Sequence, residues 1–187
     1  MSNDYESLME ETISICQDLI RIPSVNYGEG KGDEKAVAEY VVASLAEVGI
    51  AARIYESAPN RCNVIANIEG SDPTRPGLVV HGHIDVVPAN ADDWSVDPFG
   101  AVIKDGMIWG RGAVDMKGSI AAWIAAAAAV PHDAGTLSLI ITGDEEGPAT
   151  FGTQELIRHM RAVAALPDLC LVGEPTSVNR LGDMMKI

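Results

Sequence analysis

The sequence predicts an α/β fold in which helices cover a mostly parallel, mixed sheet. Helical and strand patterns alternate along the chain, and several strand patterns are continuous apolar runs, which are typical of strands buried between helices. Charged side chains follow several of these runs directly, as ligand-binding residues do in open α/β sheets. The 187 residues, 47% of them hydrophobic, are enough for one domain or for part of a larger one.

Two amphipathic helices are expected before the first strand. Apolar residues recur at helical spacing from Leu8 to Ile20, and we expect this helix to end near Pro23. Asp33 can cap the second helix, and Gly49 is expected to stop it. The expected strands are residues 50–55, 63–68, 77–81, 107–109, 137–142 and 169–172, and the later helices are residues 116–130 and 153–165, the last with Leu156, Ile157 and Met160 facing inward.

The chain is strongly acidic, with 13 Lys+Arg against 27 Asp+Glu and a net charge of −14. Such a chain repels phosphate backbones and anionic lipids, so we expect no nucleic-acid or membrane partner. Cys16, Cys62 and Cys170 are odd in number and far apart, which predicts buried or half-buried thiols in a reducing compartment. The chain shows no secretory pattern and no apolar run of membrane-spanning length, and we expect a soluble cytoplasmic protein.

The first motif whose side chains could bind a metal ion is His81-Gly-His-Ile-Asp85. His83 and Asp85 are two residues apart on an extended segment and face the same side, so the carboxylate can orient the imidazole for metal binding. His81 shares this face, and we expect it either to have a structural role or to support the metal ligands without binding the ion. Taken alone, the motif also suits an ordinary strand end with a solvated His and Asp.

Three further motifs supply carboxylates. Glycines around Asp115 allow a tight turn that delivers it to the start of the alanine-rich helix, where a lone Asp would also serve as a cap. Glu145 and Glu146 follow a strand in an acidic turn, where one can bind metal while the other acts as a general base; a solvated turn is the alternative. Glu174 also follows a strand expected to be buried, although Pro175 makes a routine turn equally reasonable.

The combination of these motifs is more specific than any one of them. One histidine and several carboxylates at strand ends suit zinc or a comparable divalent ion, and a bridging carboxylate would allow two ions. In this order, the motifs resemble those of the dinuclear-zinc peptidase family that includes aminoacylases, carboxypeptidase G, acetylornithine deacetylase and succinyl-diaminopimelate desuccinylase. The resemblance spans residues 81–183 and implies a three-layer catalytic domain of a zinc-dependent amidohydrolase or metallopeptidase.

The resemblance also implies a role for each motif residue. His83 and Glu174 would bind one zinc ion, Glu146 would bind the other, and Asp115 would bridge the two. Cobalt could replace zinc in such a site.

Two further residues would take part in catalysis according to this resemblance. Glu145 would be the general base that takes a proton from a zinc-activated water, and Asp85 would orient the metal-binding histidine. The peptide bond between Asp115 and Met116 would be cis.

The resemblance narrows the substrate class to N-acyl amino acids or peptides. Residues 144–150, 173–177 and 181–186 look most like the desuccinylase branch, which acts in lysine and diaminopimelate biosynthesis. Residues 81–116, which include the segment 92–99, look closer to a broader dipeptidase or deacylase branch. Succinyl-diaminopimelate desuccinylation is therefore the expected activity, with another deacylase or a dipeptidase as the alternative.

The family pattern extends further than this chain. Its last zinc ligand is a late histidine, which neither His132 nor His159 is expected to replace. We therefore expect residues 1–187 to be the N-terminal part of the catalytic domain, ending as a possible strand begins at residues 181–187. The dimerisation or lid domain and the C-terminal catalytic segment would be absent, and the full-length protein would be a homodimer. As it stands, the chain could instead be a non-catalytic metal-binding fragment.

Overall fold

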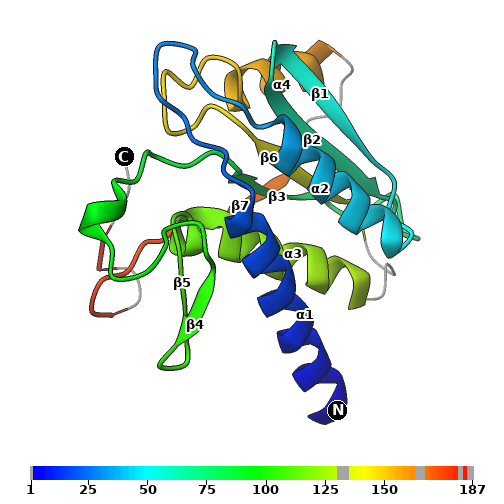
Figure 1. The fold of residues 1–187 in the computed structure, drawn as a ribbon. Coiled ribbons are helices and arrows are strands. Elements are labelled where there is room, and N and C mark those ends of the chain that lie inside the picture. Colours follow the sequence, from blue (N-terminus) through cyan, green and yellow to red (C-terminus); the bar gives the residue numbers. More distant parts are fainter. Residues whose placement is uncertain (1, 130–134, 163–166, 181–182, 185–187) are drawn as a thin grey trace.

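The computed structural model describes residues 2–129, 135–162, 167–180 and 183–184. Within them, a five-stranded sheet has the order β1-β2-β6-β3-β7, and two short strands form a separate ribbon (Figure 1). The strands are β1 (Ala52–Ala58), β2 (Arg61–Ile68), β3 (Leu78–His83), β4 (Val102–Lys104), β5 (Met107–Trp109), β6 (Leu137–Thr142) and β7 (Leu169–Val172). The helices are α1 (Ser2–Arg21), α2 (Lys35–Glu47), α3 (Gly118–Ala129) and α4 (Thr153–Ala162).

The sheet is mixed, as predicted. Strand β3 pairs in parallel with β6 and β7, whereas β2 pairs antiparallel with β1 and β6. His83 is paired with Thr142, so β3 and β6 end side by side. His81 is paired with Val172 at the end of β7, which brings Glu174, two residues further, level with His83. The carboxyl ends of three strands therefore meet at one edge.

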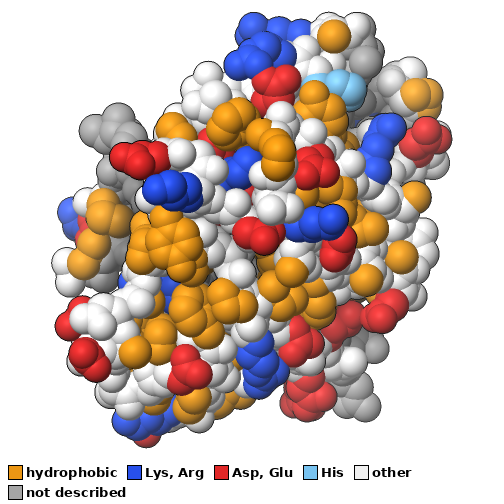
Figure 2. Space-filling view, turned by 45° about the horizontal axis from the view of Figure 1, so that its top comes forward, with side chains coloured by type: hydrophobic (Ala, Val, Ile, Leu, Met, Phe, Trp, Pro, Cys, Tyr) orange, Lys and Arg blue, Asp and Glu red, His pale blue; other side chains and the backbone are white. Residues whose placement is uncertain are grey.

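Helices cover both faces of this sheet and produce the predicted three-layer α/β arrangement (Figure 1). Helices α1, α2 and α3 share one large apolar core with β2, β3 and β6. On the opposite face, Leu156 of α4 packs against Val79 and Ile140. Acidic side chains are intermixed with Lys, Arg and hydrophobic side chains over the face shown in Figure 2.

The helix ends differ in detail from the prediction. The N-cap of α2 is Glu34, which makes no side-chain capping bond, while the Asp33 carboxylate accepts the Lys35 N–H at 3.1 Å. Gly49 follows α2 in the left-handed region (φ 79°), which confirms it as the stop signal. Helix α3 begins at Gly118 rather than at residue 116, because the residues before it form an irregular turn.

Two predictions about burial are wrong. Ile157 is 38% exposed, because α4 contacts the sheet through Leu156 and Met160, which lie four residues apart on one face. Strand β7 is exposed along its length, as is Cys170 within it, because β7 forms an edge of the sheet in the described part of the chain.

Some expectations fall outside the described residues, namely the ends of two helices at residues 130 and 163–165, His132, and most of the possible strand at 181–187. Among the described helices, none combines the length and the apolar character that crossing a lipid bilayer requires.

Candidate metal centre

His83 ends strand β3 with its side chain only 1% exposed. Its Nδ1 lies 2.9 Å from the backbone carbonyl oxygen of Asp85 and 3.4 Å from the Asp85 carboxylate. A histidine that donates from Nδ1 to such an oxygen presents Nε2 as its ligand atom. The predicted partnership with Asp85 therefore exists, but the backbone carbonyl makes the shorter contact.

Asp115 reaches His83 from an irregular turn, η2 (Ala113–Lys117). The turn starts after Gly112, whose φ of 82° favours glycine, and the bond between Asp115 and Met116 is cis, as the resemblance implied. Asp115 Oδ1 lies 2.9 Å from Nε2 of His83. The carboxylate thus approaches from a turn before the alanine-rich helix, as the glycines around it predict, although α3 itself begins three residues later at Gly118.

Lys117 anchors this turn to the end of helix α1. Its fully buried ammonium group donates to the backbone carbonyls of Leu19 at 2.8 Å and Ile22 at 2.9 Å. A cation is favourable at a helix C-terminus, where carbonyl groups lack partners within the helix. Burial lowers the pKa of Lys117 to about 7, although the nearby carboxylate of Asp85 opposes this shift.

Three glutamates complete the cluster. Glu174 Oε1 lies 3.3 Å from Nε2 of His83, and Glu145 Oε2 lies 3.8 Å from the same atom. The side chains form two groups, and within each group the potential ligand atoms lie within 4.8 Å of one another. One group is His83, Glu145 and Glu174, and the other is His83, Asp115 and Glu146. The structure therefore brings together every residue that the sequence nominated as a metal ligand.

The electrostatics of the cluster favour a bound cation. Burial alone would lower the pKa of His83, but hydrogen bonding to Asp115 and Asp85 raises it to about 10. Burial raises the pKa of Glu146, and the neighbouring carboxylates add to this shift. Carboxylates and an imidazole that together attract positive charge form a donor set suited to a divalent metal ion.

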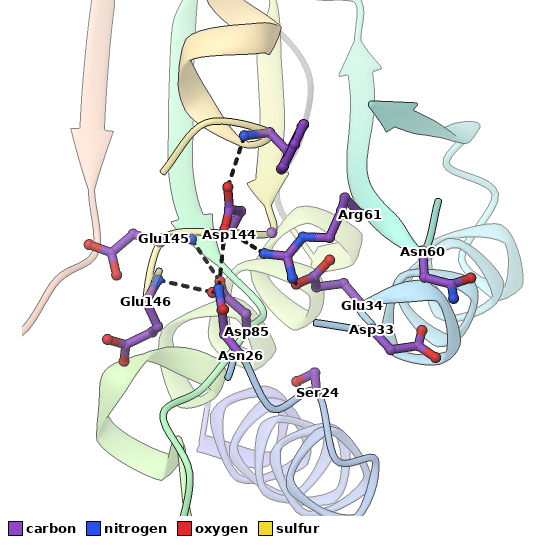
Figure 3. A network of polar contacts seen from close by, with 12 residues as sticks. Ser24, Asn26, Asp33, Glu34, Asn60, Arg61, Asp85, Asp144, Glu145 and Glu146 are labelled. Atoms are coloured by element: carbon purple, nitrogen blue, oxygen red, sulfur yellow. Dashed lines mark hydrogen bonds and ion pairs between the residues drawn. The ribbon is translucent and has the colours of Figure 1, made fainter. Parts of the chain in front are cut away.

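A buried polar network supports the cluster (Figure 3). The Asp85 carboxylate accepts the backbone N–H groups of Glu145 at 3.1 Å and Glu146 at 2.9 Å, as well as Nδ2 of Asn26 at 2.8 Å. Asn26 also lies 3.3 Å from Asp144, which in turn pairs with Arg61. Sequence reasoning did not identify Asn26 or Arg61, because their partners lie far away in the chain.

Two other histidines lie apart from the ligand groups. His81 is on the same strand, with Nε2 at 3.0 Å from the Thr153 hydroxyl of α4, and burial lowers its pKa. The His159 ring packs against Tyr55 in a tilted arrangement, with ring centroids 5.0 Å apart. These contacts agree with the structural role expected for His81.

Comparisons with known proteins identify relatives of this chain. The curated succinyl-diaminopimelate desuccinylase of Sphingopyxis alaskensis is 48% identical over 182 residues, which cover 95% of this chain and 46% of that protein. The desuccinylase of Novosphingobium aromaticivorans is 47% identical over 181 residues, with the same coverage. The chain thus spans about half the length of these relatives.

Solved structures share the fold. The di-peptidase Dug1p from Saccharomyces cerevisiae superposes with a TM-score of 0.69 at 25% identity, over 91% of this chain and 39% of that one. The model of peptidase family M20/M25/M40 matches residues 79–185, the segment that holds the ligand groups. This match covers more than half of the sequence and confirms the family that the motifs resembled. The chain belongs to peptidase family M20/M25/M40.

Proposed function

We propose that this chain is the N-terminal, metal-binding part of an amide hydrolase that removes the acyl group from an N-acyl amino acid. The observation that carries the proposal is the meeting of the His83 imidazole with Asp115 and Glu174 at the ends of neighbouring strands. Succinyl-diaminopimelate is the substrate we assign to the whole protein, because relatives about 47% identical over nearly all of this chain are desuccinylases.

We assign His83 and Glu174 to one metal ion and Glu146 to a second, with Asp115 as the bridge. Distances from His83 Nε2 support this division, since Asp115 and Glu174 lie within 3.3 Å, whereas Glu145 lies at 3.8 Å. Zinc is the proposed ion, with cobalt as an alternative, because both accept one imidazole and several carboxylates. The second ion has fewer ligands here, so its binding to this chain is expected to be weak.

The remaining residues then divide the chemistry. The metal ions, when bound, lower the pKa of water and polarise the scissile carbonyl. The Glu145 side chain is 39% exposed and can reach substrate, so we assign it as the general base that moves a proton from water to the leaving amine. Asp85 fixes the backbone of this base, because its Oδ1 accepts the Glu145 N–H, and the same oxygen lies 3.4 Å from Nδ1 of His83.

A dipeptidase is the second candidate function. It is supported by the structural similarity to the di-peptidase Dug1p at 25% identity. Both reactions cleave an amide with the same residues and differ in the group on the carbonyl side. Relative turnover of N-succinyl-diaminopimelate and of simple dipeptides by the full-length protein separates the two.

Replacement of the general base tests the mechanism. Glu145→Gln in the full-length zinc protein should lower kcat by about 100-fold to 10,000-fold, which is the usual contribution of a positioned base. Metal content should stay unchanged. The matched control is Glu69→Gln, an exposed glutamate after β2, which should keep full activity. Undiminished turnover in Glu145→Gln would remove this residue from the mechanism.

Metal titration of the 187-residue chain tests the ligand assignment separately. We expect one Co²⁺ ion to bind with a clear visible absorption band and a second to bind weakly, because the second site retains only Asp115 and Glu146. Two tight ions per chain would contradict this division of ligands.

A further inference from the structure

A buried ion cluster lies behind the candidate metal centre, between helix α2 and the loop that follows β6. Arg61 is 2% exposed, and its two terminal nitrogens lie 3.0 Å from Glu34 and 2.6 Å from Asp144, both fully buried. A guanidinium group makes strong charged hydrogen bonds to two carboxylates, but burying these charges costs solvation free energy. Each buried charge therefore depends on its partner. The fold therefore maintains a charged cluster in its interior.

The loop next to the cluster is built around Asp144. Its Oδ2 accepts the backbone N–H groups of Thr150 at 2.8 Å and Phe151 at 2.9 Å, while its Oδ1 faces Arg61. Asp144 has a φ of 60°, which is uncommon for a residue other than glycine. The carboxylate thus holds both ends of the loop that contains Glu145.

Asn26 connects this cluster to the metal centre. Its Nδ2 lies 2.8 Å from Asp85 and 3.3 Å from Asp144, so one amide group spans both carboxylates (Figure 3). The backbone of Glu145 and Glu146 is bonded to the same Asp85 carboxylate. A continuous set of polar contacts therefore runs from Arg61 to the main chain of both glutamates.

The packing around the cluster leaves no room for larger residues at two glycines. A methyl group on Gly32 would overlap the Arg61 guanidinium, and one on Gly143 would lie 2.8 Å from the Glu34 carboxyl carbon. Close packing of this kind restricts the charged side chains to one arrangement. The cluster can therefore hold the loop that follows β6 in one position.

We infer that Arg61 and Asn26 are positioning residues that hold the main chain of Glu145 and Glu146 in place for metal binding and proton transfer. Neither residue belongs to the ligand groups around His83. The inference rests on the proposed function, since it assigns the loop a catalytic purpose. The structural part of the inference is that Arg61 and Asn26 support the loop, and this part can be tested without metal.

Amide hydrogen exchange on the metal-free chain tests this support. In the wild type, Asp85 and Asp144 accept hydrogen bonds from four backbone N–H groups. In Asn26→Ala these N–H groups should exchange about 10-fold to 100-fold faster than in the wild type, as expected when hydrogen bonds to charged acceptors weaken. These are the amides of Glu145, Glu146, Thr150 and Phe151. Arg61→Met should show the same pattern, and Arg61→Lys, which keeps the positive charge, should recover part of the protection.

Leu45→Ala provides the matched control, because this fully buried α2 side chain belongs to the apolar core and is not one of the polar residues of the network. It should lower global stability while the four loop amides change no more than other amides. Equal loop exchange in Asn26→Ala and Leu45→Ala would overturn the inference. Arg61→Met leaves two buried carboxylates without a cation and can prevent folding, in which case Asn26→Ala decides the question.

Cobalt binding tests whether the support of the loop by Asn26 affects the metal site. Asn26→Ala should weaken Co²⁺ binding by about 10-fold to 100-fold and alter its visible absorption band, as loss of residues supporting metal ligands usually does. Leu45→Ala should retain the band and the affinity. Unchanged affinity and absorption in Asn26→Ala would overturn the functional part of the inference. If the wild-type chain binds no Co²⁺, the proposed function fails, while the exchange experiment still decides whether Arg61 and Asn26 hold the loop.

Discussion

The candidate metal centre has a buried half and an exposed half. The buried half comprises His83, Asp85 and Asp144, which are at most 1% exposed and lie at the ends of β3 and β6. The exposed half is β7, whose side chains are open along the strand, with Leu171 53% exposed; it leads to Glu174, which is itself 16% exposed. Both halves deliver carboxylates to one imidazole, but they do so by different means.

The difference lies in how each half holds its ligands. In the buried half, charged hydrogen bonds fix the backbone of the loop that carries Glu145 and Glu146. In the exposed half, Glu174 follows Gly173, whose backbone is bonded to the His81 carbonyl at 3.2 Å and to the Ser119 hydroxyl at 3.0 Å. Preorganised ligands bind metal with less loss of entropy. Metal affinity should therefore depend mainly on the buried half.

Removing one ligand from each half gives the largest expected difference. His83 belongs to both ligand groups, so His83→Ala should weaken Co²⁺ binding by more than about 100-fold, beyond the loss expected for a merely supporting residue. Glu174→Ala should cause a smaller loss, because the ion assigned to His83, Asp115 and Glu174 keeps the imidazole and the Asp115 carboxylate. Titration followed by visible absorption measures both.

The control for this comparison is His159→Ala, which removes an imidazole of α4 that packs against Tyr55 of β1. It should leave Co²⁺ affinity unchanged. A greater loss in Glu174→Ala than in His83→Ala would reverse the ranking of the two halves and assign the dominant role to the β7 edge.

The pH dependence of stability probes the buried ion cluster next. Burial raises the pKa of Glu34 from 4.5 to about 7, although Arg61 pulls it down. Between these values the folded chain keeps a proton that the unfolded chain releases, so the free energy of unfolding should fall as pH rises. The loss should approach about 3 kcal/mol at most, since each unit of pKa shift corresponds to about 1.4 kcal/mol.

Glu34→Gln isolates this contribution, because glutamine has a similar shape and does not titrate. Urea unfolding of both proteins at several pH values should show that the advantage of the wild type over Glu34→Gln shrinks from pH 4.5 to pH 7.5. Parallel stability curves across this range would mean that Glu34 titrates normally.

The sequence predicted the parts of the fold and site that depend on local patterns. The apolar run at residues 137–142 coincides with β6, and Gly49 stops α2 as expected. His83, Asp115 and Glu174 were identified because reactive side chains next to apolar strands form a recognisable pattern. Their convergence then followed from strand order, which the α/β pattern made it possible to anticipate.

The parts that were not predicted depend on distant contacts. Arg61 and Asp144 are 83 residues apart, and nothing near either residue indicates that they pair. The exposure of β7 also depends on which segments flank it, whereas its sequence alone is that of a buried strand. The late start of α3 reflects the turn at Asp115, where helical periodicity continues although the backbone does not.

The smallest expected effect concerns Cys170 and Cys62, one cysteine from each environment. Cys170 is exposed on β7, while Cys62 is 1% exposed and burial raises its pKa to about 11. The thiolate is the reactive form, so a thiol reagent should modify Cys170 first and Cys62 only as the chain unfolds.

Cys170→Ser should abolish the fast reaction and change the free energy of unfolding by less than about 0.5 kcal/mol, as surface substitutions usually do. Cys62→Ser should keep the fast reaction and lower stability by about 1 to 3 kcal/mol, because a hydroxyl replaces a thiol in the core. Equal losses of stability in the two variants would show that β7 is as firmly packed as β2, and the contrast between the buried core and the exposed β7 edge would then disappear.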